Sequence, residues 1–273
     1  MMTLSAFADE ISKELTEQLD VLQEHGIKYL ELRSVWGKNV KDLTDLEVEA
    51  IGQELEKRGI GVSAIGSPLG KIGIEDDFEA HLDELRRILV IAKRLKASYV
   101  RIFSFYPPEG KEAGDYREKV HSRLRTMLAV AKMEAPEIVL LHENEKGIYG
   151  DTAERCLDLL ANIKMDNFGA IFDPANFVQV GQKPFSDCYM LLKQHIRYLH
   201  IKDAMLQDGR VVPAGEGDGE IPQILADLSQ NGFSGFLSLE PHLAVAAKSH
   251  GFTGPERFGV AVAALKKILD KIG

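Results

Sequence analysis

Residues Ile138-Val139-Leu140-Leu141-His142-Glu143-Asn144-Glu145 form a short apolar run that ends in charged and polar side chains. Short runs rich in β-branched and aliphatic residues are typical of buried strands. Seven more runs of this kind occur along the chain, at Thr3 to Ala8, Lys28 to Leu32, Gly61 to Ile65, Tyr99 to Phe103, Phe168 to Phe172, Tyr198 to Ile201 and Phe236 to Leu239. The sequence therefore predicts eight strands, the fifth of them at Ile138 to His142.

Amphipathic segments with helical spacing separate these strands. Leu15, Leu19 and Leu22 precede Gly26, and a second example is the series Leu85, Ile88, Leu89, Ile91 and Ala92 before Lys96. Strict alternation of strand and helix favours parallel strands joined by helical crossovers. We therefore expect an α/β fold, a (β/α)8 TIM barrel in a single domain over residues 1–273.

A doubly wound open sheet is the competing architecture, but a glycine-rich nucleotide-binding turn does not follow the first predicted strand. The segment Gly215-Glu216-Gly217-Asp218-Gly219 lacks the Lys-Ser/Thr pair and the preceding strand of a phosphate-binding loop. Its glycines instead predict a tight loop between the seventh and eighth strands.

Composition narrows the range of partners. The formal net charge of -9 disfavours nucleic acid, whose phosphates attract clustered Lys and Arg. The two cysteines, Cys156 and Cys188, are expected to be buried reduced thiols, which suits a cytoplasmic location. The first ten residues lack a basic start and an apolar run, and no segment approaches the roughly 20 apolar residues of a membrane span. We expect no membrane partner.

Four consecutive predicted strands, the fifth to the eighth, carry or are followed by a residue that can bind a metal ion. These residues are Glu143, Asp173, His200 and Glu240. In a barrel of this class the active site lies at the carboxyl ends of the strands, so the four side chains can converge near the barrel axis. Three carboxylates and one imidazole predict one divalent ion, with Mn²⁺ favoured and Mg²⁺, Co²⁺ or Zn²⁺ as alternatives.

The two-residue period of a strand separates the side chains of the fifth strand into two sets. Leu141, Glu143 and Glu145 share one face, whereas His142 and Asn144 lie on the other. His142 is then either a histidine packed behind the barrel wall or, if the alternation weakens at the strand end, a member of the site.

The strand ends resemble the xylose isomerase-like TIM barrel superfamily of sugar and sugar-phosphate isomerases and epimerases, which also includes inosose dehydratases and endonuclease IV. The resemblance covers essentially the whole chain and rests on four motifs, His-Glu-Asn-Glu at 142–145, Asp-Pro-Ala-Asn at 173–176, His-Ile-Lys-Asp at 200–203 and Leu-Ser-Leu-Glu-Pro-His at 237–242. The metal clusters of endonuclease IV need many more histidines and carboxylates, which argues against cleavage of DNA.

By this resemblance, Glu143, Asp173, His200 and Glu240 match the metal ligands of the family. Glu143 and Glu240 also match the acid/base pair of its ketose epimerases. Two positions depart from the pattern: Glu145 stands where many relatives have His, and Asn176 stands where the epimerases tend to have His. Both residues are nevertheless candidates for substrate binding.

Other strand ends supply further candidate contacts to a substrate. Glu31 and Arg33 lie at the end of the second predicted strand, Lys71 lies after the third, and Lys202 shares a strand face with His200. For Arg33 and Lys71, an internal ion pair is an equally good interpretation of the sequence.

These residues predict a metal-dependent isomerase or epimerase that transfers protons through an enediolate of a small-molecule sugar. The same site could instead eliminate a β-substituent as a dehydratase or lyase on an inosose or keto-glycoside, with His142 as base, because that histidine resembles the proposed base of C-glycoside deglycosidases. A non-catalytic sugar-binding barrel is a third reading. A homo-oligomer is also conceivable, with Trp36, Phe105, Tyr106 and the Pro107-Pro108 loop forming a contact or a lid.

Overall fold

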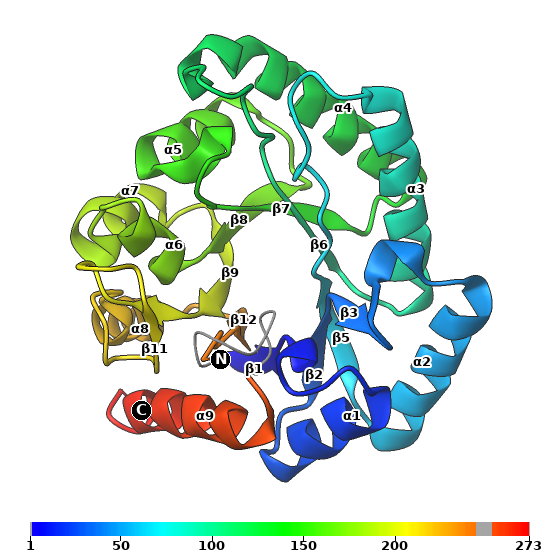
Figure 1. Cartoon of the computed structure of the whole chain (residues 1–273), viewed down its shortest axis with the longest axis vertical. Coiled ribbons are helices and arrows are strands. Elements are labelled where there is room, and N and C mark those ends of the chain that lie inside the picture. Colours follow the sequence, from blue (N-terminus) through cyan, green and yellow to red (C-terminus); the bar gives the residue numbers. More distant parts are fainter. Residues whose placement is uncertain (1, 244–252, 273) are drawn as a thin grey trace.

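Eight parallel strands close into a barrel in the computed structural model, which describes residues 2–243 and 253–272 (Figure 1). Around the barrel the strands follow the order β1-β12-β9-β8-β7-β6-β5-β2. Their bounds are β1 (Thr3–Ala6), β2 (Tyr29–Leu32), β5 (Gly61–Ile65), β6 (Tyr99–Ile102), β7 (Val139–Glu143), β8 (Phe168–Phe172), β9 (Ile196–Ile201) and β12 (Phe236–Leu239). All eight predicted strands are present, so the predicted (β/α)8 barrel is confirmed.

Helices form the outer ring of the barrel (Figure 1). They are α1 (Leu15–Glu24), α2 (Asp45–Arg58), α3 (Phe78–Arg94), α4 (Arg117–Glu134), α5 (Ala153–Asn162), α6 (Pro174–Gln179), α7 (Met190–Leu192), α8 (Ile221–Gln230) and α9 (Pro255–Leu269). Local sequence sets their ends. In α2, for example, Thr44 and Glu47 form a reciprocal capping box, and Gly59 ends the helix in the left-handed conformation at φ 65°.

Two layers of apolar side chains hold the barrel together. The larger one fills the space between strands and helices, and it includes the predicted helical residues Leu15, Leu19 and Leu22. The smaller one fills the barrel interior, where Ala64, Leu141, Ile171 and Tyr198 pack together. Because side chains along a strand alternate, the residue two positions after an interior residue points inward again, one layer nearer the carboxyl ends.

Two short hairpins extend the carboxyl ends of the barrel. The first pairs β3 (Ser34–Val35) with β4 (Lys38–Asn39), and the second pairs β10 (Asp203–Ala204) with β11 (Val211–Val212). The segments η1 (Ala8–Glu10), η2 (Val40–Asp42), η3 (Ala113–Tyr116) and η4 (Tyr149–Asp151) are 3-10 helices, and η5 (Pro184–Tyr189) is a π-helical turn. The first strand is shorter than predicted because the η1 turn begins at Ala8.

The glycine-rich loop 215–219 does more than turn the chain. Its backbone N–H groups at Gly215, Gly217 and Gly219 donate to the carboxylate of Asp203 at 2.8, 3.1 and 2.8 Å. A Cβ atom on Gly217 would lie 2.4 Å from Asp203 Oδ1. The glycines therefore allow the backbone to wrap around a buried carboxylate of the chain itself, next to the end of β9.

The exposure of individual side chains tests further predictions from the sequence. Cys156 and Cys188 are buried free thiols, as predicted. Phe105 is 1% exposed and packs against Phe78, so it does not contribute to an external contact as the sequence suggested. Trp36 is 36% exposed, in the turn between β3 and β4. Among the residues with described positions, no helix has the length and apolarity to span a bilayer.

The close approach of Gly217 to Asp203 gives a stability prediction. We expect Gly217→Ala to lower the free energy of unfolding by about 1–3 kcal/mol, because the added methyl forces the loop away from the carboxylate. Gly114→Ala is the matched control, since a Cβ atom there meets nothing within 4 Å. Urea denaturation of both variants measures the difference, and equal midpoints would show that the loop adapts without cost.

Candidate metal centre

Glu143, Asp173, His200 and Glu240 meet at the carboxyl ends of β7, β8, β9 and β12. Each is buried, and each offers one ligand atom such that all these atoms lie within 4.8 Å of one another. Three of the four stand two residues after Leu141, Ile171 and Tyr198, which line the barrel interior. The strand register thus places the four side chains in one layer directly above the interior apolar core.

The imidazole of His200 lies at the centre of this cluster. Its Nδ1 atom is 3.1 Å from Glu143 Oε1, 3.4 Å from Glu240 Oε2 and 3.8 Å from Asp173 Oδ2. On the other side of the ring, Nε2 is 3.3 Å from the carboxylate of Glu31. A proton on Nε2 that is donated to Glu31 leaves the lone pair of Nδ1 facing three carboxylate oxygens, as in many metal-bound histidines.

The electrostatics of the cluster favour a cation between these carboxylates. Burial lowers the pKa of His200, but the charges of Glu143 and Glu31 outweigh it and raise that pKa well above its usual value. Burial raises the pKa of Glu143, yet His200 and Arg101 bring it down to about 2. The pKa of Glu240 is likewise lowered, against the effect of burial, by Lys202, His200 and Arg33. Both glutamates are therefore ionised at neutral pH.

Asp173 is held in place by the chain that follows it. Its Oδ1 atom accepts a hydrogen bond from Asn176 N at 2.9 Å and caps helix α6, whose first residue is Pro174. Its Oδ2 atom lies 2.7 Å from Lys202 Nζ. The side-chain amide of Asn176 also approaches Glu143 Oε1 at 3.3 Å. The Asp-Pro-Ala-Asn motif therefore orients two of the four predicted ligands.

Arg33 takes part in a network of internal ion pairs. This is one of the two interpretations of the sequence, the other being a contact to substrate. Its guanidinium contacts Asp9 at 2.7 Å, Glu10 at 2.7 Å and Glu240 Oε1 at 2.6 Å. Lys71 is also paired, with Glu145 at 2.8 Å, and its ammonium lies 4.3 Å above the ring of Phe103. Lys202, which contacts Asp173, is 3.3 Å from Glu240 as well. All these proposed substrate contacts thus have partners within the protein.

Arg101 belongs to the site but was not predicted from the sequence. It is buried in β6, and its guanidinium donates to Glu143 Oε2 at 3.0 Å and to the carbonyl oxygens of Ser67 and Gly66. The guanidinium groups of Arg33 and Arg101 lie 4.5 and 5.1 Å from the centre of the Phe7 ring. The signal in the sequence is a charged residue inside an otherwise apolar strand.

His142 faces away from the metal-ligand cluster, as the strand alternation predicts. Its Nε2 atom lies 2.9 Å from Ser104 Oγ, and Gly150 packs directly against the ring. Burial lowers its pKa to about 4. At neutral pH the ring is therefore uncharged and enclosed behind the barrel wall.

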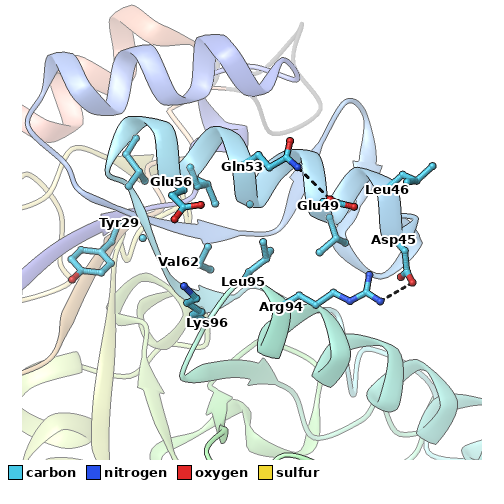
Figure 2. A pocket seen from close by; sticks show the side chains of 15 residues that line it. Tyr29, Asp45, Leu46, Glu49, Gln53, Glu56, Val62, Arg94, Leu95 and Lys96 are labelled. Carbon is cyan, nitrogen blue, oxygen red and sulfur yellow. Dashed lines mark hydrogen bonds and ion pairs between the residues drawn. The ribbon is translucent and has the colours of Figure 1, made fainter.

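A surface cleft of about 830 Å³ lies elsewhere, beside α2 and the end of α3 (Figure 2). Its strand residues, Tyr29, Gly61 and Val62, come from the amino ends of β2 and β5. Its charged side chains include the ion pair of Arg94 with Asp45. Because catalytic groups of this fold gather at the opposite, carboxyl ends of the strands, we place the functional site at the metal-ligand cluster and not in this cleft.

Comparison with known proteins agrees with this architecture. Residues 19–268 match the family model described as xylose isomerase-like TIM barrel. The chain belongs to this family. No curated protein matches the sequence.

Several solved structures of this type of barrel are similar to the chain. A D-tagatose 3-epimerase-like protein has 17% identity and a TM-score of 0.79, with 99% of this chain and 98% of that chain covered. The IOLI protein with a bound zinc atom has 19% identity and a TM-score of 0.79, with 100% and 99% covered. A probable 3-DHS dehydratase from Bacillus anthracis has 19% identity and a TM-score of 0.75, with 97% and 99% covered. At these identities the likeness establishes the fold.

The donor set of this xylose isomerase-like barrel fits a divalent metal ion. Three carboxylate oxygens and one imidazole nitrogen converge from four directions, and the imidazole is oriented by a further carboxylate. Glu31, Asn176 and the two arginines orient the ligands from outside the cluster. Glu143, Asp173, His200 and Glu240 are thus the residues that would hold the ion.

The low pKa of His142 predicts a pH-dependent contribution to stability. Between about pH 6.5 and pH 4 the unfolded chain binds a proton at this residue that the folded protein excludes, so stability falls as the pH is lowered. The loss is on the order of 3 kcal/mol over this window. Urea denaturation of the wild type and of His142→Gln across this pH range measures it. The stability of the wild type relative to the variant should fall by this amount between pH 6.5 and pH 4; parallel curves would mean that His142 titrates normally.

Proposed function

We propose that this protein is a divalent-metal-dependent sugar isomerase or epimerase that transfers a proton by way of an enediolate, with Glu143 and Glu240 as the acid/base pair. The observation that carries the proposal is the convergence of two glutamates from strands β7 and β12 on the same imidazole, 3.1 and 3.4 Å from its Nδ1 atom. Membership of the xylose isomerase-like family supports the same chemistry.

When bound, the divalent ion would polarise the substrate carbonyl and make the neighbouring C–H bond acidic. We favour Mn²⁺ on the oxygen-rich donor set, whereas related structures contain zinc or magnesium. Each glutamate directs one oxygen toward His200 and the other toward an arginine. The arginine-bound oxygens, Glu143 Oε2 and Glu240 Oε1, are the atoms that we assign to proton transfer.

The two glutamates then divide the proton transfer between them. One carboxylate accepts the proton from the carbon, and the other returns a proton to the opposite face or to the adjacent carbon. Return to the opposite face gives an epimer, and return to the adjacent carbon gives an isomer. We assign to Lys202, whose Nζ atom contacts Asp173 and Glu240, the donation of a hydrogen bond to an oxygen of the enediolate. Burial of the whole cluster excludes bulk water, which strengthens these electrostatic interactions.

Elimination by a dehydratase or lyase is the second candidate function, and the similarity to a probable dehydratase favours it. The same two glutamates could remove the proton. His142 gains no support as the base, because its ring contacts Ser104 and Gly150 and faces away from the cluster. Its role in catalysis stays a prediction from the sequence, as do a homo-oligomeric state and a cytoplasmic location.

Metal binding is tested separately from catalysis. We expect Mn²⁺ to raise the unfolding free energy of the purified, chelator-treated protein by about 2.7 kcal/mol at 100 times its dissociation constant, since the ion binds the folded state alone. Asp173→Asn should remove most of this gain. Asp208→Asn, at an exposed turn position, is the control. Thermal unfolding with and without Mn²⁺ reads out the shift; an equal shift in both variants would place the ion elsewhere.

Proton transfer is tested by incubation of the Mn²⁺-loaded protein with ketoses, ketose phosphates, inososes and keto-glycosides in D₂O. Deuterium in a rearranged sugar, detected by NMR, is the expected result, whereas deuterium accompanied by loss of water or an aglycone indicates a lyase. Glu240→Gln should lower the exchange rate by about 10²–10⁴, because glutamine has the same size as glutamate but does not accept the proton. Glu216→Gln, in an exposed loop, should not alter it. Unchanged exchange in Glu240→Gln would remove this residue from the reaction.

A further inference from the structure

The site is crowded with acidic groups. Six carboxylates belong to one connected set: Glu143, Asp173 and Glu240 in the cluster, Glu31 on His200, and Asp9 and Glu10 on Arg33. Three permanent cations, Arg33, Arg101 and Lys202, contact this set. The carboxylates of this set outnumber the arginine and lysine cations by three, and a divalent ion would offset two of these charges.

Each of these cations already has a carboxylate partner within the protein. Arg33 contacts three of them and Lys202 contacts two. Arg101 contacts Glu143, and two backbone carbonyls accept hydrogen bonds from its Nε and Nη2 atoms. An anionic substituent on a substrate could pair with one of these cations only if that cation gave up its contact with a carboxylate of the site. That exchange would leave a buried carboxylate without its partner, which is costly.

Lys71, the next cation along the wall of the site, is also paired with a carboxylate. Lys71 donates to Glu145, two residues after Glu143 on the chain, and stacks on Phe103, the ring that also lies 5.0 Å from Arg101. A lysine that was kept for a phosphate group would not have a carboxylate 2.8 Å away. Lys146, which follows in sequence, is exposed and donates to Gln179 instead of a residue of the cluster.

From this charge pairing across residues 2–243 and 253–272 we infer that the substrate is an uncharged polyhydroxy carbonyl compound, without a phosphate or carboxylate substituent. The inference rests on the proposed function, because it concerns the substrate of the same site. Hydroxyl groups suit this site: they can donate to carboxylates and accept from paired Arg and Lys without displacing a charge. A phosphate adds about two negative charges to a region that already has an excess.

The experiment compares matched pairs on the Mn²⁺-loaded full-length protein: D-fructose, D-tagatose and D-xylulose, each against its terminal phosphate ester. Deuterium exchange in D₂O gives kcat/KM, and calorimetry gives the dissociation constants. We expect kcat/KM for the best neutral sugar to exceed that for its phosphate ester at least about tenfold, because like charges in a buried site repel. A preference for the phosphate ester would overturn the inference while leaving the proposed function intact.

A charge variant tests the cause of this preference. Glu145→Gln leaves Lys71 without its acidic partner, so it should raise kcat/KM for the phosphate esters several-fold relative to that for the neutral sugars. Asp166→Asn removes the same charge at the opposite end of the barrel, where Asp166 pairs with Lys132, and should change neither value. Equal effects of the two variants would contradict a local role for this pair.

The outcomes also separate the two proposals. If no sugar exchanges deuterium, the proposed function is wrong, and the calorimetric constants for the same pairs still show whether the site prefers a neutral or an anionic ligand. If neither member of any pair exchanges or binds, the inference and the proposed function are both rejected.

Discussion

Repulsion among buried carboxylates is the constraint on which the rest of this site depends. The carboxylates of Glu143, Asp173 and Glu240 surround the Nδ1 atom of His200. Three more carboxylates lie nearby: Glu31 contacts the same imidazole, and Asp9 and Glu10 contact Arg33. Two unit charges 4 Å apart interact by about 4 kcal/mol at the effective dielectric of a protein near its surface. Such a cluster folds only if cations are built in beside it.

The barrel supplies these cations from strands that are far apart in the sequence. Arg33 after β2 holds Glu240 after β12, and Arg101 in β6 holds Glu143 in β7. The ring of Phe7, directly after β1, lies within 4.5 and 5.1 Å of the guanidinium groups of Arg33 and Arg101. The two glutamates that we assign to proton transfer are thus fixed by equivalent partners, and each keeps one oxygen directed at His200. A helical residue, Asn176 in α6, adds a contact to Glu143 Oε1 at 3.3 Å.

One further buried carboxylate is stabilised by hydrogen bonds from the backbone. Asp203, three residues after His200, is bound by backbone N–H groups of a glycine-rich loop and not by a cation. Burial raises its pKa, and these hydrogen bonds oppose that effect. The loop fixes the chain that leaves β9, so the His-Ile-Lys-Asp motif contributes His200 and Lys202 to the candidate metal centre and Asp203 to the structure beside it.

The sequence by itself determined the barrel and the four predicted ligands, because both depend on short-range patterns. Apolar runs of strand length mark β5, β8 and β12 to the residue, and the polar residues that end four strands must meet once the strands are parallel and closed. Strand alternation also separated His142 from Glu143. Tertiary structure alone decided which charges pair. Arg33 with Glu240, Arg101 with Glu143 and Lys71 with Glu145 lie 207, 42 and 74 residues apart, and nothing local in the chain encodes a partner at such a distance. Those pairings, set by the closure of the barrel, are the basis on which we infer an uncharged substrate for this site.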